Sequence, residues 1–150
     1  MALLDDDIQK QLRQAFEGLT NPVKLVMFSQ EDDGLTPGEC DMCAETRQLV
    51  EEVAALDERI QCEIYDFAKD QEKAQEFHID KIPAIMVLQG PDFKDNGIRL
   101  FGIPSGYEFG TLIQDMLMVS NGKANLSEKT LKEIGKLKEP VHIQVFTTPT

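Results

Sequence analysis

The chain has 150 residues, of which 27 are Asp or Glu and 15 are Lys or Arg, so its formal net charge is −12. Hydrophobic residues make up 41% of the sequence, which is enough to build a core and too much for a disordered tail. The acidic balance argues against binding to nucleic acid or to anionic lipid, and one domain is the default expectation for this length.

The chain has three cysteines, which are Cys40, Cys43 and Cys62. A small and odd number of cysteines is not typical of a secreted protein held together by disulfides. The N-terminus has no basic region followed by an apolar run, so no signal peptide is predicted. No stretch reaches the roughly 18 apolar residues of a membrane-spanning helix. We therefore expect a reducing, cytoplasmic compartment, where a close cysteine pair is catalytic or metal-binding rather than structural.

Hydrophobic periodicity and turn residues predict an α/β protein. The predicted helices are 5–18, 43–56, 70–77 and 106–119, and the predicted strands are 23–28, 60–67, 82–88 and 98–103. A strand, a helix and a second strand imply a parallel pair with a right-handed crossover. The last two strands, joined by the turn-rich residues 90–97, are expected to form an antiparallel hairpin. The result is a mixed sheet with helices on both faces.

The tail does not fit inside that unit. We predict a further helix over 127–137, with Ser127 as its N-cap, and a strand over 141–147. Residues 137–147 repeat 19–29 at a constant offset of 118 (Pro140 minus Pro22). Chance is the alternative, because Pro-Val before a strand is common. We interpret 1–122 as one complete unit and 123–150 as a linker helix and the first strand of a second, truncated unit.

The segment Cys40-Asp41-Met42-Cys43 lies where a polar loop meets a predicted helix. Free backbone N–H groups and the positive end of the helix dipole stabilise a thiolate there. Cys43 is one turn deeper on the same face, so the two sulfurs can approach bonding distance. Dithiol exchange needs this arrangement, because an exposed thiolate attacks a substrate disulfide and its neighbour resolves the mixed disulfide.

Metal binding is the rival interpretation of the cysteines. A closed zinc site needs four ligands, and beyond the pair the chain offers only Cys62, His78 and His142. Cys62 alternates with Ile64 on a predicted central strand, where a buried and inert cysteine is expected. We therefore predict no metal site.

Ile82-Pro83 opens a predicted buried strand and is a candidate cis peptide bond. Beside the cysteines, a cis proline would leave the preceding backbone groups free to pair with a substrate strand. The alternative is an ordinary trans proline at the start of the strand.

Taken together, these features resemble the thioredoxin superfamily, and more closely the glutaredoxin-like protein disulfide oxidoreductases, whose chain carries two tandem thioredoxin-fold units. The resemblance is carried by residues 21–25, 63–67, 79–84 and, most specifically, 101–109 (FGIPSGYEF). It implies a thioredoxin-like α/β fold, with Cys40 as the attacking thiol, Cys43 as the resolving thiol and Pro83 as the cis proline facing them.

The resemblance also implies that the redox-active disulfide works without a cofactor. The expected partners are protein disulfide or dithiol substrates, an upstream reductase and the second unit, and an isolated first unit would also favour association with a second copy. The sequence departs from the pattern at Met27, where thioredoxins carry a buried acid, and it has no recognisable glutathione site.

Two other functions stay open. One is an electron-relay or docking module of an alkyl hydroperoxide reductase-type flavoprotein, although the first unit of that protein characteristically lacks a working CxxC. The other is a structural domain whose cysteines merely pair or bind zinc.

Acidic residues surround the motif in sequence: Glu31, Asp32, Asp33, Glu39 and Asp41. Negative charge opposes a thiolate, so the loop is expected to disfavour ionisation of Cys40 and to make the dithiol reducing. The alternative is that these acids only solubilise the loop. Met42, between the cysteines, completes the motif.

Overall fold

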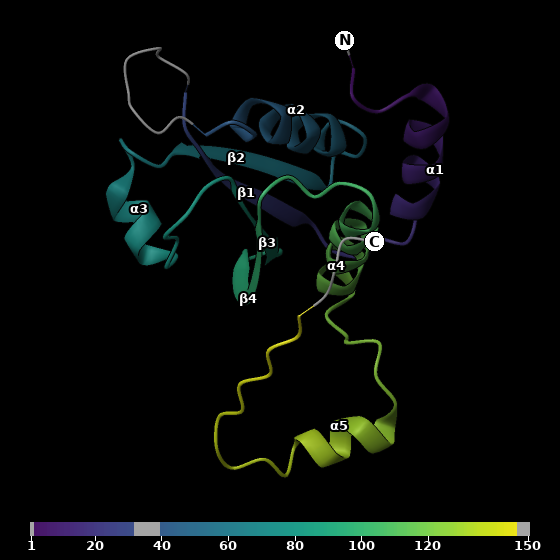
Figure 1. The fold of residues 1–150 in the computed structure, drawn as a ribbon. Coiled ribbons are helices and arrows are strands. Elements are labelled where there is room, and N and C mark those ends of the chain that lie inside the picture. The colour runs from purple at the N-terminus through teal and green to yellow at the C-terminus, as the bar shows by residue number, and fades with distance from the viewer. Residues whose placement is uncertain (1, 32–39, 147–150) are drawn as a thin grey trace.

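A four-stranded mixed sheet forms the centre of the computed structural model, which describes residues 2–31 and 40–146 (Figure 1). The strands are β1 (Val23–Ser29), β2 (Ile60–Asp66), β3 (Ala84–Gln89) and β4 (Lys94–Phe101), in the order β2-β1-β3-β4. β1 pairs with β2 in parallel, whereas the β1–β3 and β3–β4 pairs are antiparallel. The predicted mixed sheet and its hairpin are confirmed.

Four helices cover the two faces of the sheet, as expected: α1 (Asp6–Phe16), α2 (Cys43–Ala54), α3 (Gln71–Glu76) and α4 (Tyr107–Asn121). A further helix, α5 (Glu128–Ile134), buries none of its residues and does not cover the sheet. Buried side chains of α1, α2 and α4 form one apolar cluster with one face of the sheet, and α3 packs on the other face. The arrangement is a thioredoxin-like α/β fold.

β1 is the centre of the core because it is buried on both faces. Its residues Leu25 and Met27 belong to the cluster under α1, α2 and α4, whereas Val26 and Phe28 face α3. The Phe28 ring stacks on Tyr65, with ring centroids 5.3 Å apart. A strand covered on both sides needs a continuous apolar run instead of an alternating one, and β1 has such a run.

Polar contacts anchor α1 and α4 at the end of the sheet where β1 begins. Arg59 donates to the carbonyl oxygens of Phe16 and Leu19 at 2.8 and 2.7 Å, which satisfies carbonyls at the end of α1. The fully buried Ser120 of α4 binds the backbone of Thr20 and Asn21. The opposite end of the sheet is formed by the end of β1, the end of β2 and the start of β3.

The structure corrects two predictions about the sheet. β4 begins at Lys94, four residues before the predicted start at 98, because residues 94 and 95 pair with Gln89 and Leu88 across a register shift. β2 is an edge strand and not a central one, because β3 takes the other side of β1. Cys62 on β2 is accordingly only half-buried, and not fully buried as expected.

The tail differs from its prediction in one respect. Helix α5 forms where expected, but residues 141–146 of the predicted strand 141–147 form no strand, and Thr147 lies outside the described residues. A strand needs a neighbour for its backbone hydrogen bonds, and every residue from 121 to 146 is exposed. The second, truncated unit over 123–150 stays a prediction. Among the described residues, no helix is long and apolar enough to cross a membrane.

Candidate active site

A tight turn that begins at Cys40 leads into α2. The N–H of Cys43 donates to the carbonyl of Cys40 at 3.2 Å. Met42 occupies the N-cap position without a side-chain hydrogen bond, and its carbonyl accepts from both the backbone N–H (3.0 Å) and the hydroxyl (2.6 Å) of Thr46. Because Thr46 is fully buried, these two bonds fix the first turn of the helix.

Cys40 and Cys43 are joined by a disulfide, with their Cα atoms 5.4 Å apart. The two sulfur-bearing residues differ in exposure, since Cys40 is half-buried whereas only 1% of Cys43 is exposed. Asp41 and Met42 between them are exposed. A reagent or substrate therefore reaches Cys40 before Cys43.

The structure brings Ile82 and Pro83 to the same end of the sheet. β3 is antiparallel to β1 and Ala84 pairs with Phe28, so Pro83 lies beside the end of β1, from which the cysteine loop departs. The Ile82–Pro83 peptide bond is cis, in agreement with the sequence prediction. Sequence reasoning missed a second cis bond, Gly90–Pro91, at the opposite end of the sheet.

Only some of the backbone hydrogen-bonding groups around Pro83 have a partner. Its carbonyl accepts from the N–H of Gly102 at 2.9 Å, which ties this loop to the end of β4. The N–H and C=O of Ile82 have no hydrogen-bond partner among residues 2–31 and 40–146. Unpaired backbone groups at the start of a strand can accept an added peptide strand.

The acidic surroundings of the motif are less uniform than the sequence suggests. Glu31 forms an ion pair with Lys69 at 3.1 Å, and Lys69 also lies 3.7 Å from Asp66. Burial works against the charge of Asp66, but hydrogen bonds from the N–H groups of Ala68 and Lys69 outweigh it and lower the pKa of that carboxyl. Glu39, Asp32 and Asp33, which were expected to act on Cys40, lie outside the described residues.

Two residues singled out from the sequence do not join the dithiol. Met27 is fully buried in β1, at the position where the thioredoxin pattern has a buried acid. Burial raises the pKa of the Cys62 thiol to about 11, so this cysteine is almost entirely protonated at neutral pH. In the described part of the chain, no group of three or more His, Cys, Asp or Glu residues is placed to hold a metal ion.

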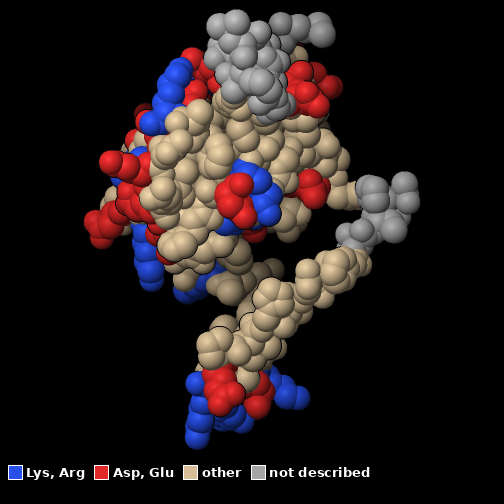
Figure 2. All heavy atoms as spheres, turned by 60° about the vertical axis from the view of Figure 1, so that its left-hand side comes forward, with Lys and Arg blue, Asp and Glu red and all other residues tan. Residues whose placement is uncertain are grey.

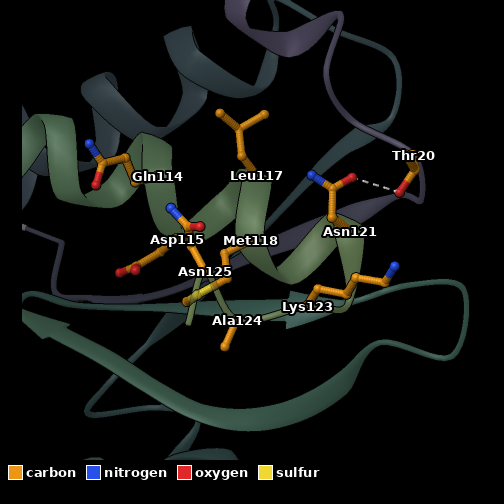
Figure 3. Close-up of a pocket in the computed structure, with 9 residues that line it drawn as sticks. All are labelled: Thr20, Gln114, Asp115, Leu117, Met118, Asn121, Lys123, Ala124 and Asn125. Carbon is orange, nitrogen blue, oxygen red and sulfur yellow. Dashed lines mark hydrogen bonds between the residues drawn. The ribbon is translucent and has the colours of Figure 1, made fainter. Parts of the chain in front are cut away.

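A hollow of about 850 Å³ lies far from the cysteines along the sheet (Figure 3). It is lined by Thr20, by α4 residues including Asp115 and Leu117, and by the start of the tail. The Thr20 hydroxyl donates a hydrogen bond of 2.9 Å to the side-chain oxygen of Asn121, drawn as a dashed line in Figure 3. Because Thr20 precedes the start of β1 and the cysteine loop follows its end, this hollow is not part of the candidate active site. A smaller hollow of about 270 Å³ is lined by Ser29, Glu31 and Arg47 at the cysteine end.

The comparisons with known proteins are consistent with this geometry. No protein-family model matches the chain. The chain is 27% identical to an NADH dehydrogenase of Bacillus subtilis over 148 residues, which is 99% of this chain and 25% of that protein. The chain therefore spans about a quarter of the length of the curated relatives that it matches.

Two solved structures share the fold. The alkylhydroperoxide reductase AhpF of Enterococcus faecalis superposes with a TM-score of 0.76 and 26% identity, over 89% of this chain and 61% of that chain. A protein disulfide oxidoreductase from Aeropyrum pernix gives a TM-score of 0.74 and 22% identity, over 91% and 57% of the two chains. The chain is thus a thioredoxin-like module with a disulfide-forming cysteine pair, similar to the N-terminal part of AhpF.

Proposed function

We propose that this thioredoxin-like module is a thiol–disulfide oxidoreductase that acts on protein disulfides through Cys40 and Cys43. The observation that carries the proposal is the asymmetry of the pair at the head of α2. Cys40 is accessible and Cys43 is buried, which is the order that attack and resolution require. The half-buried Cys62 takes no part in the proposed mechanism.

The reaction starts from the dithiol form. The Cys40 thiolate attacks one sulfur of a substrate disulfide, and a mixed disulfide forms while one substrate thiolate leaves. The Cys43 thiolate then attacks the sulfur of Cys40, which closes the Cys40–Cys43 disulfide and releases the second substrate thiolate. Two electrons pass from the dithiol to the substrate, the released thiolates take up the two protons that the dithiol gave up, and an upstream reductase or small dithiol restores the starting form.

The neighbouring residues position the substrate in this proposal. The free backbone groups of Ile82 would hydrogen-bond an extended segment of the substrate, and Pro83 would hold that segment against the disulfide. Asp41 and Met42 would contact the substrate from the motif, and the acids that include Glu39 would oppose the thiolate. The redox group is the cysteine pair itself, without a cofactor, and the proposed setting is a reducing cytoplasm.

Cysteine substitutions test the mechanism in an insulin-disulfide reduction assay driven by dithiothreitol. Cys40→Ser should abolish turnover, whereas Cys43→Ser should stop turnover but leave a mixed disulfide that mass spectrometry detects. Cys62→Ser is the matched control and should keep full activity. Turnover by Cys40→Ser at the rate of the unsubstituted chain would contradict the mechanism.

A second function is favoured by the likeness to the alkyl hydroperoxide reductases among the curated relatives, one of which, from Staphylococcus epidermidis, aligns over 99% of this chain. In that case the same dithiol would relay electrons within a larger reductase instead of serving many protein substrates. The reduced chain would then react faster with a disulfide in another component of such a reductase than with insulin. Equal rates would favour the general oxidoreductase.

A further inference from the structure

The Thr46 side chain lies in the first part of α2, on the same buried face as the resolving cysteine of the proposed mechanism. Thr46 follows Cys43 by three residues, and residues at this spacing are neighbours on one face of a helix. Thr46 is 0% exposed and Cys43 is 1% exposed, whereas Ala44 and Glu45 between them are exposed. Helix α2 thus places a hydroxyl group beside a buried sulfur.

The hydrogen bond that the Thr46 hydroxyl makes is one that the backbone can lose. The hydroxyl donates to the carbonyl of Met42 at 2.6 Å, and the backbone N–H of Thr46 donates to the same carbonyl at 3.0 Å. When the hydroxyl turns away, the carbonyl keeps its helical bond, so no backbone group is left unpaired in the interior. Because Met42 directly precedes Cys43, the hydroxyl already points back toward the turn that holds the sulfur.

A thiolate at Cys43 needs stabilisation because burial opposes the charged form of a thiol. The half-buried Cys62 shows the size of this effect, since burial raises its pKa to about 11. Cys43 is more deeply buried than Cys62, and in the proposed mechanism it attacks Cys40 as a thiolate. The start of α2 supplies part of the stabilisation through the helix dipole, and a hydrogen bond to the sulfur would supply more.

No buried carboxyl can take this role in the described part of the chain. At the position where the thioredoxin pattern has a buried acid, β1 carries Met27. Asp and Glu side chains lie on the surface, where Figure 2 shows them in red, and none of the described ones is buried. The buried polar residues there are Ser29, Thr46 and Ser120. Ser29 ends β1 and Ser120 binds the backbone near the start of β1, so Thr46 alone of these shares a helix with Cys43.

We propose that the Thr46 hydroxyl stabilises the thiolate of Cys43 by moving its hydrogen bond from the Met42 carbonyl to the sulfur when the disulfide is reduced. This inference rests on the proposed function, because it concerns the step in which Cys43 resolves the mixed disulfide. Thr46 then does the work that a buried acid does elsewhere in the thioredoxin pattern, but as a hydrogen-bond donor and not as a base.

The resolving step follows from this exchange of partners. The proton of Cys43 passes to the solvent, and its thiolate, held by the hydroxyl, attacks the sulfur of Cys40. The bond between Cys40 and Cys43 forms while the bond from Cys40 to the substrate sulfur breaks. The substrate thiolate leaves with the electron pair and takes up a proton from the solvent. Once Cys43 has lost its charge, the hydroxyl returns to the Met42 carbonyl, where the disulfide form of the structure has it.

A single turnover with one equivalent of the disulfide reagent DTNB tests the step. The reduced chain releases one nitrothiobenzoate when Cys40 attacks the reagent and a second when Cys43 resolves the mixed disulfide, and absorbance follows both phases. Every variant also carries Cys62→Ser, so that this thiol does not react. In Thr46→Val the second phase should be about tenfold slower at pH 7, because a hydrogen bond to a charged group contributes at least that factor. Its pH midpoint should rise by about one unit, and the first phase should stay unchanged.

Thr46→Ser is the matched control because it keeps the hydroxyl, and its second phase should stay within about twofold of the parent. An unchanged second phase in Thr46→Val, or an equal slowing in the two variants, would overturn the role of Thr46 and leave the proposed function standing. A parent chain without a first phase would instead refute the proposed function, and this inference with it.

The parent chain provides a second measurement that needs no substitution at Thr46. Its second phase should reach half of its maximal rate at a pH below the value of about 11 for the Cys62 thiol, although Cys43 is the more deeply buried of the two. A midpoint at or above that value would overturn the proposal, because the thiolate of Cys43 would then have no effective hydrogen-bond donor.

Discussion

Ser120→Ala should be the most informative single change for stability. The Ser120 hydroxyl is fully buried and makes three hydrogen bonds to the segment between α1 and β1. It accepts from the N–H groups of Thr20 and Asn21 at 2.9 and 3.0 Å, and it donates to the carbonyl of Asn21 at 2.6 Å. Alanine fits the space but leaves three backbone groups without these partners.

The magnitude follows from the number of bonds. Each hydrogen bond contributes about 1 kcal/mol net, so the variant should lose about 3 kcal/mol of unfolding free energy. For a chain of this length, that loss corresponds to roughly 6–12 °C in Tm. Urea titration followed by circular dichroism measures the loss directly, provided that the slope of the transition is unchanged.

The matched control is Ser127→Ala. Ser127 accepts from the N–H of Thr130 at 3.1 Å as the N-cap of α5, but it is exposed. Because α5 buries none of its residues, the loss of this cap should change global stability by less than about 0.5 kcal/mol, although caps elsewhere contribute about 1 kcal/mol. A loss below about 1 kcal/mol for Ser120→Ala, or equal losses in the two variants, would refute the reasoning.

Three further predictions follow from single contacts. Gly90→Ala should lower the free energy of unfolding in urea titration by about 3 kcal/mol, because a Cβ there would clash with the carbonyl oxygen of Pro22. The hydrogen-bonded Arg99 lowers the pKa of Asp95 to about 2, so Asp95→Asn should destabilise the fold at pH 6, and the difference should vanish as the pH falls from about 4 to 2. With the disulfide intact, iodoacetamide at pH 8 should alkylate Cys62 about 100-fold more slowly than an unperturbed thiol, because its pKa is raised to about 11.

Each of these expectations has a result that contradicts it. Gly97→Ala is a control for Gly90→Ala, because a Cβ at Gly97 meets no atom within 4 Å and only the left-handed backbone conformation opposes alanine. An equal loss of unfolding free energy in the two variants would rule out the steric argument for Gly90. The sign for Asp95 is set by its depressed pKa, since a carboxyl that ionises more readily in the folded state stabilises it above the unfolded pKa. A stability difference between Asp95→Asn and the parent that grows toward pH 2 would be inconsistent with this linkage. Alkylation of Cys62 at the rate of an unperturbed thiol would contradict the raised pKa of this residue.

Local patterns in the sequence predicted most of the elements. The buried run at Val23, the apolar spacing of the helices and the turn residues depend on neighbours within a few positions, and these elements appear within a few residues of their predicted bounds. The same holds for the Cys40–Cys43 pair, because its spacing and the helix start alone bring the sulfurs together. The place of Pro83 before a buried strand left cis and trans open, and the resemblance to the thioredoxin superfamily implied the cis bond that the structure has.

Long-range packing decided the rest. The sequence could not indicate that β2 lies at an edge, because strand order depends on which strand takes the other side of β1. Nor did the sequence indicate the ion pair between Glu31 and Lys69, which is 38 residues away, or the hydrogen bond between Ser120 and Asn21, which are 99 residues apart. Residues 141–146 show the same limit: their likeness to the segment of β1 predicted a strand, but a strand forms only where another strand completes its backbone hydrogen bonds.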